Sequence, residues 1–378
     1  MNKYILIILY VFQINAEAQS SALDVADSLY ANGNYTKAIN SYLEIEDKHA
    51  VYSKIAKAYL ALGNRGKALE NYKLSTDANP DDALIKYEYA KLLLASKKYK
   101  EASDIFEKLI YIDYKNPNYH YQKGLALEKL NDSTALNRFL SAYNLDDTHQ
   151  KAIYKIARHH LVKRHHQLSH RYIDKGLESY AENIELISLK AQNYYYQEYH
   201  DQAITWFNKL IELGETSEFI HEKLSLSYAK QSDYKEAIYH RTEALKYNPY
   251  NATAMYVIGT YYEKLKDYKQ AEEFISKSLN LKDVPLNDEY IKLGRVLNYQ
   301  KKYAEAIVAY QKAVKEKPQD LFAQFALLTT KDQYYADKKT VIKLYEKFIE
   351  DHPNDKMFKP LIEHRISELK KEEFMNKD

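Results

Sequence analysis

A short phrase recurs along the chain and constrains its architecture more than any other feature. It consists of a polar turn, two variable residues and then an alanine; the alanines are Ala38, Ala68, Ala102, Ala135, Ala203, Ala237, Ala271 and Ala306. Their spacings are 30, 34, 33, 68, 34, 34 and 35 residues, and the spacing of 68 covers two periods with a degenerate copy near Ser169. A period of about 20–50 residues indicates small units stacked on copies of themselves.

Each copy predicts two antiparallel helices joined by the polar turn. In one copy Gly259 and Tyr262 precede the turn at helical spacing, and Ala271 and Ile275 follow it. We expect the small residues, such as Gly259 and Gly294, to lie where two helices approach closely, and most of the 39 tyrosines to pack between helices. Only 8 glycines and 7 prolines occur in 378 residues, which excludes a turn-rich β fold, and the absence of cysteine excludes disulfides.

The repeat resembles the tetratricopeptide repeat. The fullest copy contains Tyr290, Leu293, Gly294, Ala306, Tyr310, Ala313 and Pro318. The resemblance implies an all-α, right-handed superhelical solenoid of antiparallel helix pairs. We expect about ten repeats over residues 19–355, with a degenerate unit at 150–183, followed by a C-terminal capping helix and tail over 356–378.

The first 18 residues have the three parts of an export signal in the right order. Lys3 supplies a positive charge, residues 4–14 are almost entirely apolar, and Ala16-Glu17-Ala18 is a small-x-small cleavage pattern. Eleven helical residues span only about 16 Å, too short for a permanent transmembrane helix. We therefore expect a signal peptide over 1–18 and a periplasmic or secreted protein of a Gram-negative-type envelope. The alternatives are a retained anchor or a buried helix of the first repeat.

Composition and motifs favour a protein that is not an enzyme. The formal net charge of +2 gives no reason to bind nucleic acid. Phosphate-binding glycine loops, zinc-protease motifs and nucleophile elbows are absent from the sequence, and paired acids such as Asp81-Asp82 lie where they would cap helices. We expect no cofactor and no catalytic residue.

The resemblance implies that the first helix of each repeat lines a concave groove. The positions expected to face this groove are Lys57, Tyr87, Lys91, Tyr121, Tyr154, Arg158, Tyr195, Tyr256, Lys264 and Arg295. Cations interleaved with aromatic rings suit a protein or peptide partner that carries carboxylates. The sequence therefore predicts an exported interaction scaffold. The alternatives are an accessory subunit of an envelope enzyme or of an assembly or secretion complex, and a merely solvated inner face.

One segment stands apart from the repeat pattern because it is rich in histidine. Five of the 13 histidines lie between His159 and His170. His166 and His170 are four residues apart and could share a metal ion on one helical face, but the surrounding arginines and lysines would repel a cation. We assign no metal site here. The segment is either structural or solvated, or it responds to an anion or to pH, and capture of a metal ion is the remaining alternative.

Overall fold

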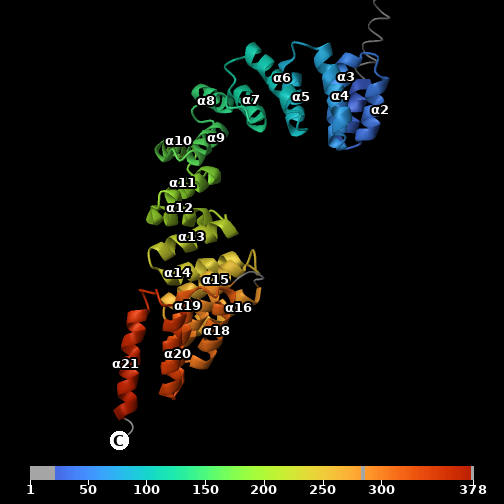
Figure 1. Cartoon of the computed structure of the whole chain (residues 1–378). Coiled ribbons are helices and arrows are strands. Elements are labelled where there is room, and N and C mark those ends of the chain that lie inside the picture. The colour runs from blue at the N-terminus through green and yellow to red at the C-terminus, as the bar shows by residue number, and fades with distance from the viewer. Residues whose placement is uncertain (1–21, 282–285, 376–378) are drawn as a thin grey trace, which may run out of the picture. The chain divides into compact units, whose positions relative to one another are not determined.

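The computed structural model describes residues 22–281 and 286–375, and every regular element in these ranges is a helix (Figure 1). The predicted signal peptide over 1–18 lies outside the described residues. Contacts divide the chain into two units, Met1–Leu189 and Lys190–Asp378. None of the described helices is long and apolar enough to cross a membrane.

The first unit consists of helices separated by short turns. They are a helix over residues 22–31, α2 (Tyr35–Glu44), α3 (Lys48–Ala61), α4 (Arg65–Ala78), α5 (Ala83–Ala95), α6 (Tyr99–Ile112), α7 (Pro117–Lys129), α8 (Ala135–Leu145), α9 (Gln150–Val162) and α10 (His166–Ser179). Helix α3 packs on α4, α5 on α6, α7 on α8 and α9 on α10, and each pair also packs on the next.

The second unit repeats this arrangement. Helix α11 (Ile184–Tyr196) begins in the first unit and ends in the second; then follow α12 (His200–Glu212), α13 (Glu218–Lys230), α14 (Tyr234–Leu245), α15 (Ala252–Lys264), α16 (Tyr268–Leu281), α17 (Asn287–Tyr299), α18 (Tyr303–Glu316), α19 (Leu321–Tyr334), α20 (Lys338–Asp351) and α21 (Lys359–Met375). From α12 to α21 each helix packs on the next one in the sequence. The predicted all-α fold of paired helices is confirmed.

Small residues bring the two helices of a pair into close contact. A Cβ atom built on Gly259 of α15 would lie 2.6 Å from Ile275 Cγ1 and 3.1 Å from the backbone oxygen of Ala271, both on α16. A Cβ on Gly294 of α17 would lie 2.7 Å from the ring of Tyr310 on α18. The predicted close approach at these two glycines is confirmed.

The turn inside a pair ends the first helix with one residue in the left-handed conformation. Such residues in the described turns are Gly33, Gly63, Lys97, Asn131, Arg164, Glu198, Ser232, Lys266 and Lys301. After α5, the amide of Lys97 donates to the Leu94 carbonyl (3.1 Å) and that of Lys98 to the Leu93 carbonyl (2.9 Å). These bonds satisfy the last carbonyls of the helix. The chain therefore reverses sharply here even where the left-handed residue is not glycine.

Second-helix tyrosines fill the space between pairs, as the repeat pattern predicts. Tyr42, Tyr72 and Tyr310 are buried. Burial raises the pKa of Tyr72 and of Tyr310 to about 12, so both hydroxyls stay protonated. The hydroxyl of Tyr42 donates to Asp27 Oδ1 (2.5 Å) in the preceding helix.

Helix α21 packs on α20 through apolar residues and one buried acid. Ile362, Ile366 and Leu369 lie in the same core cluster as residues of α20. Asp332 of α19 is only 5% exposed, and Arg365 of α21 donates to both of its carboxylate oxygens (2.8 and 3.4 Å). The hydroxyl of Tyr345 on α20 donates to Asp332 at 3.1 Å. One carboxylate thus joins three helices.

We expect Gly259→Ala to lower the free energy of unfolding by about 1–3 kcal/mol, because the added methyl meets backbone atoms that cannot move aside. The matched control is Gly66→Ala in α4, where a Cβ meets nothing closer than 3.8 Å. This control should gain about 0.5 kcal/mol through helix propensity. Urea unfolding followed by circular dichroism measures both, and shifts of the same sign would contradict the packing argument.

We expect Arg365→Gln to destabilise the protein by about 1–3 kcal/mol, because it removes the principal donor to the buried carboxylate of Asp332. Lys370→Gln is the control on the same helix, since the Lys370–Glu346 pair (3.1 Å) is exposed. Its effect should stay within about 0.5 kcal/mol. Equal losses from the two variants in thermal unfolding would show that Asp332 does not join the helices.

Candidate functional site

The ten residues predicted to face a groove all lie on first helices of the pairs. Lys57 is on α3, Tyr87 and Lys91 on α5, Tyr121 on α7, Tyr154 and Arg158 on α9, Tyr195 on α11, Tyr256 and Lys264 on α15, and Arg295 on α17. The cations of α3, α5, α9 and α15 are exposed, whereas Arg295 and most of the tyrosines are partly buried.

Tyr121 corrects the prediction, because its side chain belongs to the core. It is 9% exposed, and its ring centroid lies 5.8 Å from Phe139 of α8 and 5.2 Å from His149 at the start of α9. Burial raises the pKa of Tyr121 to about 12. The residue packs two neighbouring pairs together and cannot cover a side chain of a partner.

Arg295 also has a role within the chain. Its Nε atom donates to Glu263 Oε1 on α15 (2.6 Å) and its Nη2 atom to Oε2 (3.2 Å), while Lys292 Nζ lies 2.9 Å from Oε2. The Glu263 side chain is 9% exposed. Burial alone would raise the pKa of Glu263, but the hydrogen bonds from Arg295 and Lys292 outweigh it and the pKa falls below its usual range. Arg295 therefore joins two consecutive repeats.

Other first-helix lysines are neutralised in the same manner. Lys54 of α3 pairs with Asp27 of the helix over residues 22–31 (2.6 Å), and Lys155 of α9 pairs with Glu128 of α7 (2.6 Å). Lys91 pairs more loosely with Glu88 on its own helix (3.3 Å) and lies 5.1 Å from the ring centroid of Tyr87. Much of the positive charge on the first helices thus serves contacts within the protein.

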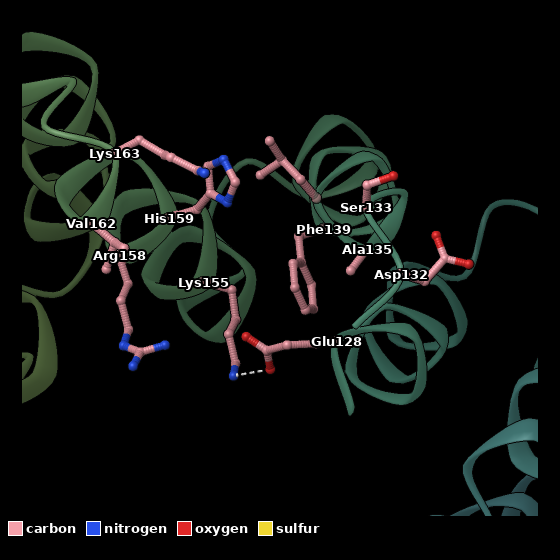
Figure 2. A pocket seen from close by; sticks show the side chains of 11 residues that line it. Glu128, Asp132, Ser133, Ala135, Phe139, Lys155, Arg158, His159, Val162 and Lys163 are labelled. Carbon is pink, nitrogen blue, oxygen red and sulfur yellow. Dashed lines mark hydrogen bonds and ion pairs between the residues drawn. The ribbon is translucent and has the colours of Figure 1, made fainter. Parts of the chain in front are cut away.

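A hollow of about 230 Å³ opens where α7, α8 and α9 meet (Figure 2). We name it the α7–α9 hollow; its lining residues are Glu128, Asp132, Ser133, Ala135, Leu136, Phe139, Lys155, Arg158, His159, Val162 and Lys163. Its apolar part consists of Ala135, Leu136, Phe139 and Val162. The polar part is divided between acids from the α7 side and cations from α9.

The two sides of the hollow differ in how their charges are satisfied. Glu128 is paired with Lys155, as the dashed line in Figure 2 shows, and Asp132 accepts hydrogen bonds from the hydroxyl and amide of Thr134 (2.7 and 2.9 Å). Arg158 and Lys163 are exposed, and neither makes an ion pair with another described residue. The hollow therefore combines an apolar wall with two cations that are available to an anionic group.

His159 adds a third basic group to this hollow. Burial, and then the positive charges of Lys163 and His165, lower the pKa of His159. The ring is therefore neutral at pH 7 and can gain a proton in acid. The next residue, His160, stacks on Tyr172 with ring centroids 5.8 Å apart, so it packs α9 against α10.

The described residues contain no group of three or more His, Asp or Glu side chains able to hold a metal ion. Sequence reasoning found Arg158 and the histidine-rich segment but missed Phe139, Leu136 and Val162. These apolar residues follow the ordinary repeat pattern, and the packing of one pair on the next leaves Val162 exposed and Leu136 partly exposed, while Phe139 is only 3% exposed. The hollow can bind an anion beside an apolar group, and nothing in its lining forms a nucleophile with a base.

Family models of the tetratricopeptide repeat match residues 59–125, 222–285 and 290–320. The TPR repeat-containing protein MJ1428 of Methanocaldococcus jannaschii is 25% identical, and the match covers 66% of this chain and 44% of that protein. The superkiller complex protein 3 of Homo sapiens is 22% identical, and the match covers 79% of this chain and 21% of that protein. This chain thus spans less than half of either relative.

The structure of the C-terminal part of a TPR repeat-containing protein from Cytophaga hutchinsonii has the same fold. It is 16% identical, covers 64% of this chain and 99% of its own, and superposes with a TM-score of 0.52. Repeat spacing, helix pairing and three separate family matches agree that the chain contains tetratricopeptide repeats.

Proposed function

We propose that this protein is a non-enzymatic scaffold that binds a segment of a partner protein, and that the α7–α9 hollow receives an acidic side chain of that segment together with an apolar neighbour. The observation that carries the proposal is the pair of exposed cations, Arg158 and Lys163, beside the apolar wall of the hollow. The repeat family supports the general role of binding protein.

The chemistry of the hollow explains this choice of ligand. A guanidinium can donate two parallel hydrogen bonds to a carboxylate, which gives direction as well as attraction. Leu136 and Val162 would bury the apolar side chain that follows or precedes the acid. Glu128 and Asp132 on the opposite side would repel a second acid, so the hollow selects one negative charge in one orientation.

Other first-helix residues of each unit would make weaker contacts of their own. Lys57 in the first unit and Lys264 in the second are exposed and would attract acidic segments over longer range. Tyr87, Tyr154, Tyr195 and Tyr256 are partly buried, so each offers only part of its ring. An accessory subunit that brings an enzyme or an assembly factor to its complex would use the same surface.

We expect Arg158→Glu and Lys163→Glu to weaken the binding of an acidic peptide at least about tenfold, because each replaces an attraction with a repulsion. The probe is a fluorescein-labelled peptide with alternating Glu and Phe, compared with its Gln–Phe counterpart by fluorescence anisotropy. Lys108→Glu is the control for net charge, since Lys108 is exposed on α6, a second helix.

Equal weakening by Lys108→Glu would show that binding follows net charge and not the hollow. Inorganic phosphate distinguishes the second candidate function, a site for small anions, which His159 and the two cations favour. Competition by millimolar phosphate that is as strong as competition by unlabelled peptide would favour the small anion. Weak competition would favour a protein segment.

We also propose that the protein is exported and acts in the periplasm or outside the cell. The charged start, the apolar run over 4–14 and the Ala16-Glu17-Ala18 pattern support this proposal. Expression in a Gram-negative host, osmotic-shock fractionation and N-terminal sequencing should recover a chain that begins at Gln19. A chain that keeps residues 1–18 and stays with the cytoplasmic fraction would refute export.

A further inference from the structure

Two histidine rings meet inside the second unit, between α13 and α14. His221 is 6% exposed and His240 is 5% exposed, and their Nδ1 atoms are 3.0 Å apart. A hydrogen bond at this distance needs one Nδ1–H donor and one bare Nδ1 acceptor. Both rings cannot be protonated at once without placing two N–H groups head to head.

Packing holds both rings in place. Tyr228 of α13 stacks on His240 with ring centroids 5.4 Å apart and an angle of 9° between the planes. On the other side, His221 Nε2 lies 2.9 Å from Thr216 Oγ1, which lies 2.9 Å from the hydroxyl of Tyr247 after α14. From α12, the side-chain amide of Asn208 donates to the Tyr228 hydroxyl (3.3 Å). The rings therefore have little room to separate while α13 and α14 stay packed.

The charged groups around the pair are already engaged with one another. Arg241 of α14 pairs with Glu222 of α13 (3.1 Å), and Glu243 pairs with Lys246 (2.6 Å). The other titratable groups near the pair are Tyr228, Tyr239 and Tyr247, and Tyr261 of α15 lies near Arg241. No carboxylate makes an ion pair with either ring in the described structure. An imidazolium formed here would therefore lack a close counter-charge.

These surroundings disfavour protonation of both rings. Burial, and then the neighbouring His221, lower the pKa of His240 to about 4, with Glu243 acting weakly in the opposite direction. Burial lowers the pKa of His221 as well; Glu243 opposes this shift and Lys246 adds to it. An exposed histidine takes up its proton near pH 6.5.

We propose that the His221–His240 contact is an acid-sensitive latch, which holds α13 on α14 at neutral pH and lets the pair open more often in mildly acidic medium. The neutral rings fit the closed pair, whereas protonated rings favour the open one. The closed pair is therefore fully stabilised above about pH 6.5, which is the pKa of an exposed histidine. This stabilisation declines as the pH falls from about 6.5 toward the lower pKa of the buried ring. Protonation of His240 alone raises the population of the open α13–α14 pair about tenfold between pH 7.0 and pH 5.5.

Release at this point would interrupt the stack within the second unit. Helix α13 also packs on α12, and α14 packs on α15, so a loosened pair leaves its neighbours on both sides without support. The latch shares no residue with the α7–α9 hollow, which lies in the first unit. The latch and the proposed binding site can therefore be tested separately.

Hydrogen exchange of the full chain, measured by mass spectrometry at pH 7.0 and pH 5.5, tests the latch after correction for the intrinsic exchange rate. We expect the opening equilibrium of α13 and α14 to rise about tenfold. Helices α17 and α18 contain no histidine and pack on α16, on each other and on α19, so they serve as the control within the same molecule. They should change less than twofold.

The double variant His221→Gln/His240→Gln removes both titrating rings and should abolish most of the acid response, although its opening at pH 7.0 will be greater. An acid response of α13 and α14 that persists in this variant would overturn the proposal. If the variant does not fold at pH 7.0, the wild-type comparison decides alone. Equal opening of the two helix pairs at pH 5.5 would then overturn the proposal, and selective opening of α13 and α14 would support it.

Discussion

The structure depends on one constraint, which is that a pair of helices this short cannot bury its apolar residues alone. Each pair packs instead on the next copy, and the core becomes a series of clusters such as those around Phe106, Ile153 and Ile275. Contacts between neighbours replace contacts between distant segments. The polar groups of the protein must therefore be satisfied repeat by repeat.

Close helix contact explains why the repeat can be recognised in the sequence. Gly259 faces Ile275 and Gly294 faces Tyr310, and in both places a side-chain methyl would overlap atoms of the partner helix. Only a small residue fits there, so its recurrence marks the register of the pairs. The left-handed turn is less visible, because residues such as Lys266 and Ser232 adopt it as well as glycine does. Backbone hydrogen bonds impose the turn there, so no particular residue type marks its position in the sequence.

The sequence predicted the fold far better than the site, because the two depend on interactions between residues at different separations along the chain. Helical periodicity is local, whereas the partner of a charged side chain is often one repeat away. Arg295 was assigned to a ligand although its partner, Glu263, stands 32 residues earlier. Tyr121 was assigned to an open face although Phe139 and His149 enclose it. Position on a first helix is therefore insufficient to identify a binding residue.

What distinguishes α9 from the other first helices is the balance of its charges. Along most of the described repeats a cation on one helix meets an acid on its own or a neighbouring helix, as Lys54 meets Asp27 and Arg295 meets Glu263. On α9 only Lys155 is neutralised by the preceding repeat, while Arg158 and Lys163 border an open apolar wall. These two cations lie beside apolar side chains at the boundary between two repeats. The binding that we propose at this boundary follows from that combination, because attraction to an acid and burial of an apolar side chain can occur together there.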